Sequence, residues 1–279
     1  MKHKNRLSAA AISLAIVTLI IVPGCKTSKL SRVSASSTGN QTLDLYLLIG
    51  QSNMSGRASI EPPEKDTINN VYLFTGTGWE SAANPLNKYS TVRKSLSMQK
   101  LGPGYSFARE LEKCTGKKIG LVVNARGGTS IESWEKGYKG ANDYHLYEEA
   151  VKEIRKAEKY GKLKAIIWHQ GEANSRRSSQ YMALLKKLVK DLRHDLGGNI
   201  YFVAGQIGQW RPTNKNINQV ITMIPNDIKN SDYVSTDGLS PLKGDSSNPH
   251  FDTRSQLILG ERYAEKVLKN IYDMPPCQN

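Results

Sequence analysis

Three features common in other protein classes are missing from this sequence of 279 residues. It has no internal repeat, and its length is enough for one generous domain or two small ones. Beyond the first 25 residues it has no long apolar run, which disfavours a membrane-embedded protein. It also lacks any Lys/Arg block interleaved with aromatic residues. We therefore expect no nucleic-acid partner, although the formal net charge is +14, and we attribute that charge to solubility and a mild attraction to acidic glycans.

The one long apolar run lies at the start of the sequence and has the layout of a bacterial export signal. A basic start precedes an apolar stretch from Leu7 to Val22, and "VPGC" follows, which resembles a lipobox ending at Cys25. We predict a lipoprotein signal peptide over 1–24, a flexible tether over 25–42, and one domain over 43–279. An exported cell-envelope lipoprotein, periplasmic or surface-exposed, would touch the membrane only through a lipid anchor on Cys25. An ordinary signal peptide cut nearby is the alternative.

Cysteine is scarce, and only Cys114 and Cys277 remain if Cys25 carries lipid. An even pair in an oxidising compartment is consistent with a disulfide. Cys114 is equally well explained as a small buried apolar residue at a helix end, so the pairing stays open.

Apolar strands alternate with periodic helices along the domain. We expect strands over 43–49, 71–75, 118–125, 164–170 and 200–207, and helices over 103–116, 143–161, 179–198, 215–228 and 253–272. A short extended piece, "DYVST", precedes the last helix. Such alternation predicts right-handed crossovers and an α/β fold, with a central parallel sheet covered by helices on both faces.

Three polar, glycine-containing loops follow three of these strands: "GQSNMSGR", "NARGGTS" and "HQGEANS". The carboxyl ends of parallel strands lie at one edge of a sheet, where functional groups collect. Ser52, in the first loop, is a candidate nucleophile, which would need a general base, an acid and oxyanion donors nearby. A serine that only caps a turn is the alternative.

Among the histidines, His250 is the best candidate for the base. It lies in a loop directly before the last helix, where it can face Ser52. His145 and His194 lie on helices among charged residues and are expected at the surface. His169, at a strand end, fits either a core position or the site.

Four blocks in order, "GQSNMSGR", "ARGGTSIESW", "WHQGEAN" and "PHFDTRSQLILGERYA", resemble the SGNH-type hydrolases. In particular they resemble carbohydrate esterase family 6, the acetylxylan esterases and their sialate O-acetylesterase-like relatives. The resemblance runs from about Leu43 to Ile271. It implies a flavodoxin-like three-layer α/β/α fold, no cofactor, and removal of O-acetyl groups from sugars. By the same match Ser52 is the nucleophile and His250 the base.

The oxyanion donors are predicted from the same blocks. The backbone N–H groups of Ser52, Gly127 and Gly128 suit this role, because glycine lets the backbone approach a ligand closely. Gln170 stands where the superfamily has an asparagine, so its side-chain amide is a further candidate. A tight turn at the glycines and a core amide at Gln170 are the structural alternatives.

The acid of the site departs from the superfamily pattern, which has an aspartate three residues before the histidine. Ser247 occupies that position here. We assign the acid to Glu172, with Asp245 as the alternative, and explain Asp252 as an acid near a helix amino end. A metal bound by His169 and Glu172 is disfavoured, because no third ligand is evident, and we predict no metal.

For the substrate we assign Gln51 and Asn53, beside the nucleophile, and Arg57, Arg126 and Trp134. Either arginine would hold a sugar acid or an acetate oxygen, with a structural salt bridge as the alternative. Trp134, Trp79 and Trp210 offer stacking surfaces for sugars, although packing against the sheet explains at least two of them better.

These features together predict a serine esterase that deacetylates carbohydrates. A lipase or thioesterase on the same fold would need a broad apolar acyl pocket, whereas these loops are rich in Ser, Asn, Gln and Arg. A surface lipoprotein that binds glycans without turnover is the competing hypothesis outside the enzymes.

Overall fold

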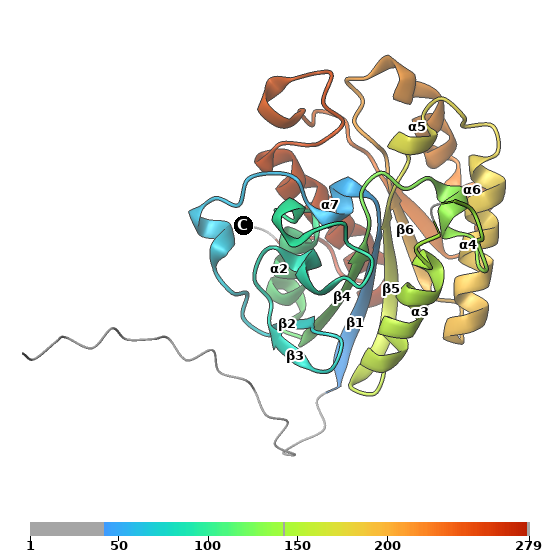
Figure 1. Cartoon of the computed structure of the whole chain (residues 1–279). Coiled ribbons are helices and arrows are strands. Elements are labelled where there is room, and N and C mark those ends of the chain that lie inside the picture. Colours follow the sequence, from blue (N-terminus) through green and yellow to red (C-terminus); the bar gives the residue numbers. More distant parts are fainter. Residues whose placement is uncertain (1–41, 142, 278–279) are drawn as a thin grey trace, which may run out of the picture. The chain divides into compact units, whose positions relative to one another are not determined.

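The computed structural model describes residues 42–141 and 143–277 of the chain (Figure 1). A seven-stranded sheet in the order β3-β2-β4-β1-β5-β6-β7 forms its centre. The strands are β1 (Leu43–Gly50), β2 (Val71–Phe74), β3 (Trp79–Ser81), β4 (Ile119–Ala125), β5 (Gly161–His169), β6 (Tyr201–Gly205) and β7 (Ser231–Val234). The α-helices are α1 (Ser52–Ser55), α2 (Gly104–Thr115), α3 (Leu146–Ala157), α4 (Tyr181–Leu196), α5 (Lys215–Thr222), α6 (Ile224–Asp227) and α7 (Thr253–Tyr272). Short 3₁₀ turns are η1 (Pro62–Lys65), η2 (Leu86–Tyr89), η3 (Leu96–Met98), η4 (Ile131–Trp134), η5 (Glu172–Asn174), η6 (Pro212–Asn214) and η7 (Leu242–Gly244).

Strand β1 lies at the middle of the sheet and is buried along its whole length. It pairs in parallel with β4 on one side and with β5 on the other. Its side chains alternate between the two faces, with Leu45 and Leu47 in one core cluster and Tyr46 and Leu48 in the other. This two-sided burial explains why the strand has a near-continuous apolar sequence.

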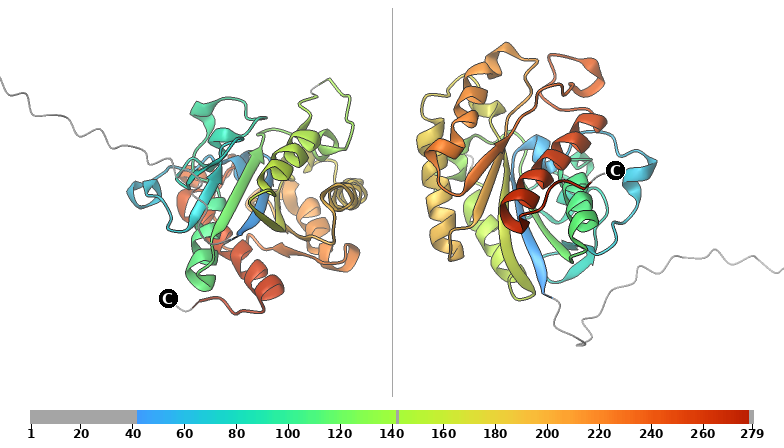
Figure 2. Two further views of the ribbon diagram at one scale, coloured as in Figure 1. Left: turned by 90° about the horizontal axis from the view of Figure 1, so that it is seen from below. Right: turned by 180° about the vertical axis from the view of Figure 1, so that it is seen from behind.

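Helices cover both faces of the sheet, as Figures 1 and 2 show. Residues of α2 and α7 belong to the core cluster on one face, and residues of α3, α4 and α5 to the cluster on the other. Helix α7 lies alongside α2 (right view of Figure 2). The two helices approach closely at Gly260, where a Cβ would come within 2.1 Å of the Pro103 carbonyl oxygen. The predicted α/β fold, a central and mostly parallel sheet between two helical layers, is confirmed.

Two local features differ from the sequence prediction. The edge strand β3, which follows a turn and pairs antiparallel with β2, was not expected. The single helix expected over 215–228 is instead two helices, α5 and α6, with Met223 between them and a proline in the first turn of α6. Proline fits the first turn of a helix but has no N–H for its interior, which accounts for the break.

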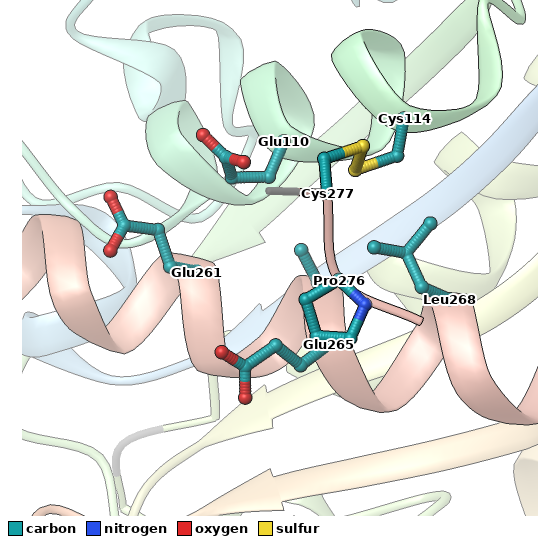
Figure 3. Close-up of a pocket in the computed structure, with 8 residues that line it drawn as sticks. Glu110, Cys114, Glu261, Glu265, Leu268, Pro276 and Cys277 are labelled. Carbon is teal, nitrogen blue, oxygen red and sulfur yellow. A yellow bond between two sulfur atoms is a disulfide. The ribbon is translucent and has the colours of Figure 1, made fainter. Parts of the chain in front are cut away.

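Cys114 and Cys277 form a disulfide, with their Cα atoms 5.5 Å apart, which resolves the pairing that the sequence left open. The bond ties the segment that follows α7 to the end of α2 (Figure 3). Beside it lies a small cavity of about 120 Å³ lined by Glu110, Glu261 and Glu265 among others. Cys114 lies shortly before the start of β4, so the disulfide is near the amino edge of the sheet.

The predicted signal peptide and almost all of the predicted tether lie outside the described residues. In residues 42–141 and 143–277, no helix has both the length and the apolar character that crossing a membrane requires.

Candidate active site

Three of the predicted loops begin at one edge of the sheet. Gly50, the last residue of β1, is in register with Ala125 of β4 and with His169 of β5. The loops that start at residues 51, 126 and 170 therefore leave the sheet side by side. The strand order also runs in opposite directions on either side of β1, and such a switch point is where open α/β sheets bind ligands.

A sharp turn at Gly50 brings Ser52 to the start of the short helix α1. Gly50 has φ +137°, and a Cβ on it would lie 2.2 Å from the backbone oxygen of His169. Only glycine fits this turn without strain. Ser52 is 7% exposed. Within the described part of the chain, its hydroxyl makes no hydrogen bond, so the oxygen is not committed to a structural role.

Gly127 lies directly against Ser52. A Cβ on Gly127 would be 3.3 Å from Cβ of Ser52 and 2.5 Å from Nη2 of Arg57. Gly128, which follows, is exposed and has φ +78°. Neither glycine N–H donates to a protein acceptor among the described residues. The loop therefore offers free backbone donors beside the hydroxyl of Ser52, the arrangement that an oxyanion site requires.

The loop that carries His250 is bonded to Asn53, the residue after Ser52. Nδ2 of Asn53 donates to the carbonyl oxygen of Pro249 at 3.0 Å, and the N–H of Phe251 donates to Oδ1 of Asn53 at 3.2 Å. The residues on both sides of His250 are thus held by the neighbour of Ser52. The structure brings the predicted nucleophile and the predicted base to the same edge.

His250 is half-buried, and burial lowers the pKa of its imidazole to about 4, with the positive charge of Arg57 as a second cause. The ring is therefore neutral at pH 7, which is the form that can accept a proton. Trp210 supports this loop, because its ring packs edge-to-face on Phe251 and its Nε1–H donates to the carbonyl oxygen of Asn248 at 2.9 Å.

Glu172 lies at the same edge, as the first residue of η5. Its Oε1 accepts a hydrogen bond from Nδ2 of Asn53 at 2.5 Å. Its Oε2 is buried and has no partner in the described part of the chain. Burial raises the pKa of Glu172 to about 7, although Asn53 and backbone N–H groups oppose the shift. A group that titrates near neutral pH at such an edge is typical of a functional site.

In the described part of the chain, Asp245, the alternative acid, bonds within its own loop and not to the ring of His250. Its carboxylate is exposed and accepts hydrogen bonds from the N–H and the hydroxyl of Ser247, which lower its pKa. Among the described residues, no hydrogen bond or ion pair joins the ring of His250 to Asp245 or to Glu172. The contact of Glu172 with this loop runs through Asn53.

Gln170 does not have a free amide hydrogen for a substrate. Gln170 is fully buried, and its Nε2 donates to Oε1 of Gln51, to the carbonyl oxygen of Thr129 and to Oδ1 of Asn174. An amide nitrogen has two hydrogens, and both are used by these acceptors. The prediction that Gln170 donates to an oxyanion is not supported, because its amide bonds to Gln51, Thr129 and Asn174. Gln51 accepts from Gln170 through Oε1, and its assignment to substrate binding stays a prediction.

Two other residues assigned to substrate binding are also buried. Trp134 is fully buried, donates to Oγ1 of Thr129, and packs edge-to-face on Trp168, so it offers no surface to a sugar. Asn53 is fully buried and uses its whole amide for protein contacts. Trp79 packs over Gly120 at the start of β4, as the structural alternative had it.

His169 is a core residue, which settles the choice that the sequence left open. It is fully buried, its Nδ1 lies 3.0 Å from the hydroxyl of Tyr263, and burial lowers its pKa to about 3. His145 and His194 lie at the surface as predicted. In the ranges 42–141 and 143–277, no three His, Cys, Asp or Glu side chains come together as a metal site would require.

Two arginines lie close to the Gly127–Gly128 loop in space or in sequence. Arg57 donates to the carbonyl oxygens of Gly56 and Met98, and Nη1 of Arg126 donates to that of Val92. The guanidinium of Arg126 also lies over the ring of Tyr144, at 3.4 Å from its centroid. Within the described residues neither arginine forms an ion pair, which removes the salt-bridge alternative for both.

Sequence reasoning missed Lys94. Its Nζ lies 3.3 Å from the position that a Cβ on Gly128 would take, and it forms no ion pair in the described part of the chain. It comes from an irregular loop between η2 and η3, where no periodicity or motif marks it. It forms, together with Arg57 and Arg126, a set of three cations that we call the cationic rim.

Comparison with known proteins identifies the family. Residues 42–269 match the model of a family described as "Carbohydrate esterase, sialic acid-specific acetylesterase". The chain belongs to this family. It is therefore one of the carbohydrate esterases.

Similar proteins agree with this assignment. The carbohydrate esterase is 31% identical over 256 residues to a probable carbohydrate esterase of Arabidopsis thaliana, covering 81% of this chain and 90% of the other. An X-ray structure of a protein from Arabidopsis thaliana superposes with a TM-score of 0.71 at 28% identity, covering 82% of this chain and 99% of the other. A carbohydrate acetylesterase from Xanthomonas citri shares the fold, with a TM-score of 0.63 at 20% identity, covering 82% of this chain and 57% of the other.

Proposed function

We propose that this carbohydrate esterase is a serine enzyme that removes O-acetyl groups from sugars such as acetylated xylan or sialic acid. The observation that carries the proposal is the convergence of three segments at Ser52. Gly127 packs against its Cβ, and the residues on either side of His250 are bonded to its neighbour Asn53. A hydroxyl, a neutral imidazole and free backbone donors at one edge are the parts that acyl transfer needs.

In the proposed reaction, the neutral imidazole of His250 takes the proton of Ser52 as the oxygen attacks the acetyl carbonyl. The N–H groups of Ser52, Gly127 and Gly128 hold the oxyanion, and removing one such donor typically costs about 3 kcal/mol of transition-state stabilisation. His250 then returns the proton to the departing sugar oxygen. Water, activated by the same imidazole, releases acetate from the acyl-enzyme. Glu172 is the carboxylate that we assign to this site.

The rim of the site favours a sugar over a lipid. Arg57 and Lys94 lie beside Gly127 and Gly128, where the acyl group would lie, and Arg126 directly precedes these glycines in the chain. Charged and hydrogen-bonding groups suit the hydroxyls and acids of a carbohydrate, whereas a lipase or thioesterase needs an apolar surface for its acyl chain.

The test is acetate release from a panel of acetylated glycans by the purified protein and by Ser52→Ala. We expect turnover of at least one acetylated sugar, and a loss of roughly 10³-fold or more in Ser52→Ala. Binding of glycans that persists with no turnover by the wild-type protein would favour the non-catalytic alternative. Release of long-chain acids in preference to acetate would favour a lipase.

We further propose export as a lipoprotein anchored through Cys25. The basic and apolar start of the sequence supports this, and the disulfide between Cys114 and Cys277 is consistent with an oxidising compartment. Labelled palmitate should enter the protein in a bacterial host, and Cys25→Ala should abolish the labelling. Labelling that survives this change would contradict the anchor.

A further inference from the structure

We propose that Asn53 is a positioning residue that couples Glu172 to His250, so that the carboxylate acts on the base through an amide. This inference rests on the proposed function, because it assigns His250 the role of base. It explains how a carboxylate without a hydrogen bond to the imidazole still supports the site.

Every polar atom of the Asn53 side chain is used in this coupling. One hydrogen of Nδ2 goes to Oε1 of Glu172 at 2.5 Å, and the other to the carbonyl oxygen of Pro249 at 3.0 Å. Oδ1 accepts from the N–H of Phe251 and from Nε2 of Gln256, both at 3.2 Å. The two donors at Oδ1 and the two acceptors at Nδ2 fix the orientation of the amide.

This geometry connects the three functional elements through one rigid group. Asn53 follows Ser52 in α1, it contacts Glu172 after β5, and it bonds to the backbone before and after His250. The amide is planar and fully buried, so a shift of Glu172 moves the amide and with it the loop. Misplacing a catalytic group by about 1 Å can cost ~10²-fold in rate.

Among the described residues, neither carboxylate in the loop around His250 bonds to its imidazole ring. Asp245 is exposed and accepts from Ser247, while Asp252 accepts from the N–H of Ser255 and caps α7. Within residues 42–141 and 143–277, Oε1 of Glu172 is therefore connected to this loop only through the side-chain amide of Asn53. An ionised carboxylate makes the stronger acceptor, so the charge on Glu172 tightens the contact with Asn53.

The first test compares two substitutions of Glu172. Glu172→Gln keeps an oxygen that can accept from Nδ2 of Asn53, whereas Glu172→Leu removes it. If the coupling is right, Glu172→Gln loses less than about fivefold in kcat, and Glu172→Leu loses ~10²-fold. A carboxylate that had to stabilise the imidazolium directly would make both variants equally poor, and that result would overturn the inference.

The second test is a double-mutant cycle between Asn53→Leu and Glu172→Leu. If Glu172 acts through Asn53, the double variant has about the same kcat as Asn53→Leu alone, because the contact is already broken. Losses that multiply would show two independent effects and would overturn the inference. A kcat for Asn53→Leu within twofold of wild type would also overturn it.

Asn218→Leu is a matched control for the loss of a buried amide. Asn218 is also buried and bonds to both the N–H and the carbonyl oxygen of one loop residue, Ile207, but in the described part of the chain its side chain forms no hydrogen bond to a residue of the site. We expect similar losses in Tm for Asn53→Leu and Asn218→Leu, and a loss of kcat only in the former. If Asn53→Leu does not fold, the comparison of the two Glu172 variants still decides the question.

Ser52→Ala separates this inference from the proposed function. Turnover that survives Ser52→Ala refutes the proposed mechanism as a whole. Turnover that is lost in Ser52→Ala but kept in Asn53→Leu refutes only the role of Asn53.

Discussion

The N–H of Phe251 donates to Oδ1 of Asn53, joining residues 198 positions apart in the sequence. One partner follows the first strand, and the other precedes the last helix. Ser52 directly precedes Asn53 in the sequence, and His250 directly precedes Phe251. The bond therefore joins the neighbours of the two residues to which we assign the chemistry.

The pH dependence of kcat/KM should show two separate steps. Burial raises the pKa of Glu172 to about 7 and lowers that of His250 to about 4. As the pH falls through 7, Glu172 gains a proton and loses the charge that strengthens its bond to Asn53, so activity should fall a few-fold. As the pH falls through 4, His250 gains a proton and can no longer act as a base, so the remaining activity should disappear.

Glu172→Gln should remove the upper step and leave the lower one. Its activity should stay flat between about pH 8 and 5, at the level that the wild type reaches when Glu172 is protonated. An unchanged step near pH 7 in this variant would assign that step to another group.

The free energy of unfolding should also depend on the protonation of Glu172. Its pKa is raised in the folded state, so the native protein binds more protons than the unfolded chain between about pH 4.5 and 7. The free energy of unfolding due to this group therefore falls as the pH rises through that window. We expect Glu172→Gln to have a higher Tm than wild type at pH 8, by a few degrees, and no advantage at pH 4. Equal melting curves at both pH values would contradict the burial of a charge here.

Two glycines near Ser52 should respond differently to alanine. At Gly50 the new Cβ meets the backbone of β5 in a region of positive φ, so we expect a loss of roughly 3 kcal/mol or more in the free energy of unfolding. At Gly127 the Cβ meets the end of the flexible Arg57 side chain, which can move. Gly127→Ala should fold, but kcat should fall ~10²-fold because the oxyanion position is crowded. Denaturant titration and steady-state kinetics on both variants separate the two effects.

Lys94 should matter for acidic substrates only. Its Nζ lies beside Gly128 with no anionic partner in the described residues, as part of the cationic rim. Lys94→Gln should raise KM several-fold for an acetylated sugar that carries a carboxylate, and leave KM for a neutral acetate ester unchanged. Lys190→Gln, the same charge change on the exposed face of α4, is the control. An equal rise in KM in both variants would show that Lys94 acts only through the net charge of the protein, and would contradict a specific contact with the substrate.

The fold and the position of the site could be predicted from the sequence because they depend on repeated, local signals. Apolar runs ending in glycine-rich polar loops mark strands whose carboxyl ends meet at one edge, and Ser52 and His250 lie there as expected. The order of the parallel strands could not be read from the sequence, since their pairing partners lie far apart in the chain. The antiparallel β3 lies close to its partner β2, but its 3 residues are too short a run to show an alternating pattern.

The roles of individual polar side chains were harder to predict. Asn53, Gln51 and Gln170 were assigned to substrate or oxyanion, but they are buried and bond to protein groups. An amide in a functional motif looks the same in sequence whether it faces the ligand or supports the loop that does. Only the positions of its partners distinguish these roles, and the partners of Asn53 lie more than a hundred residues away.

The bond between α1 and the segment before α7 also has a consequence for biosynthesis. A polypeptide emerging from the ribosome presents its serine early, but the imidazole arrives only when nearly the entire domain has been made. Fragments that end before residue 250 should be inert however well their sheet forms. Turnover thus serves as a sensitive indicator that the whole domain has been synthesised and that its C-terminal part has folded onto the first loop.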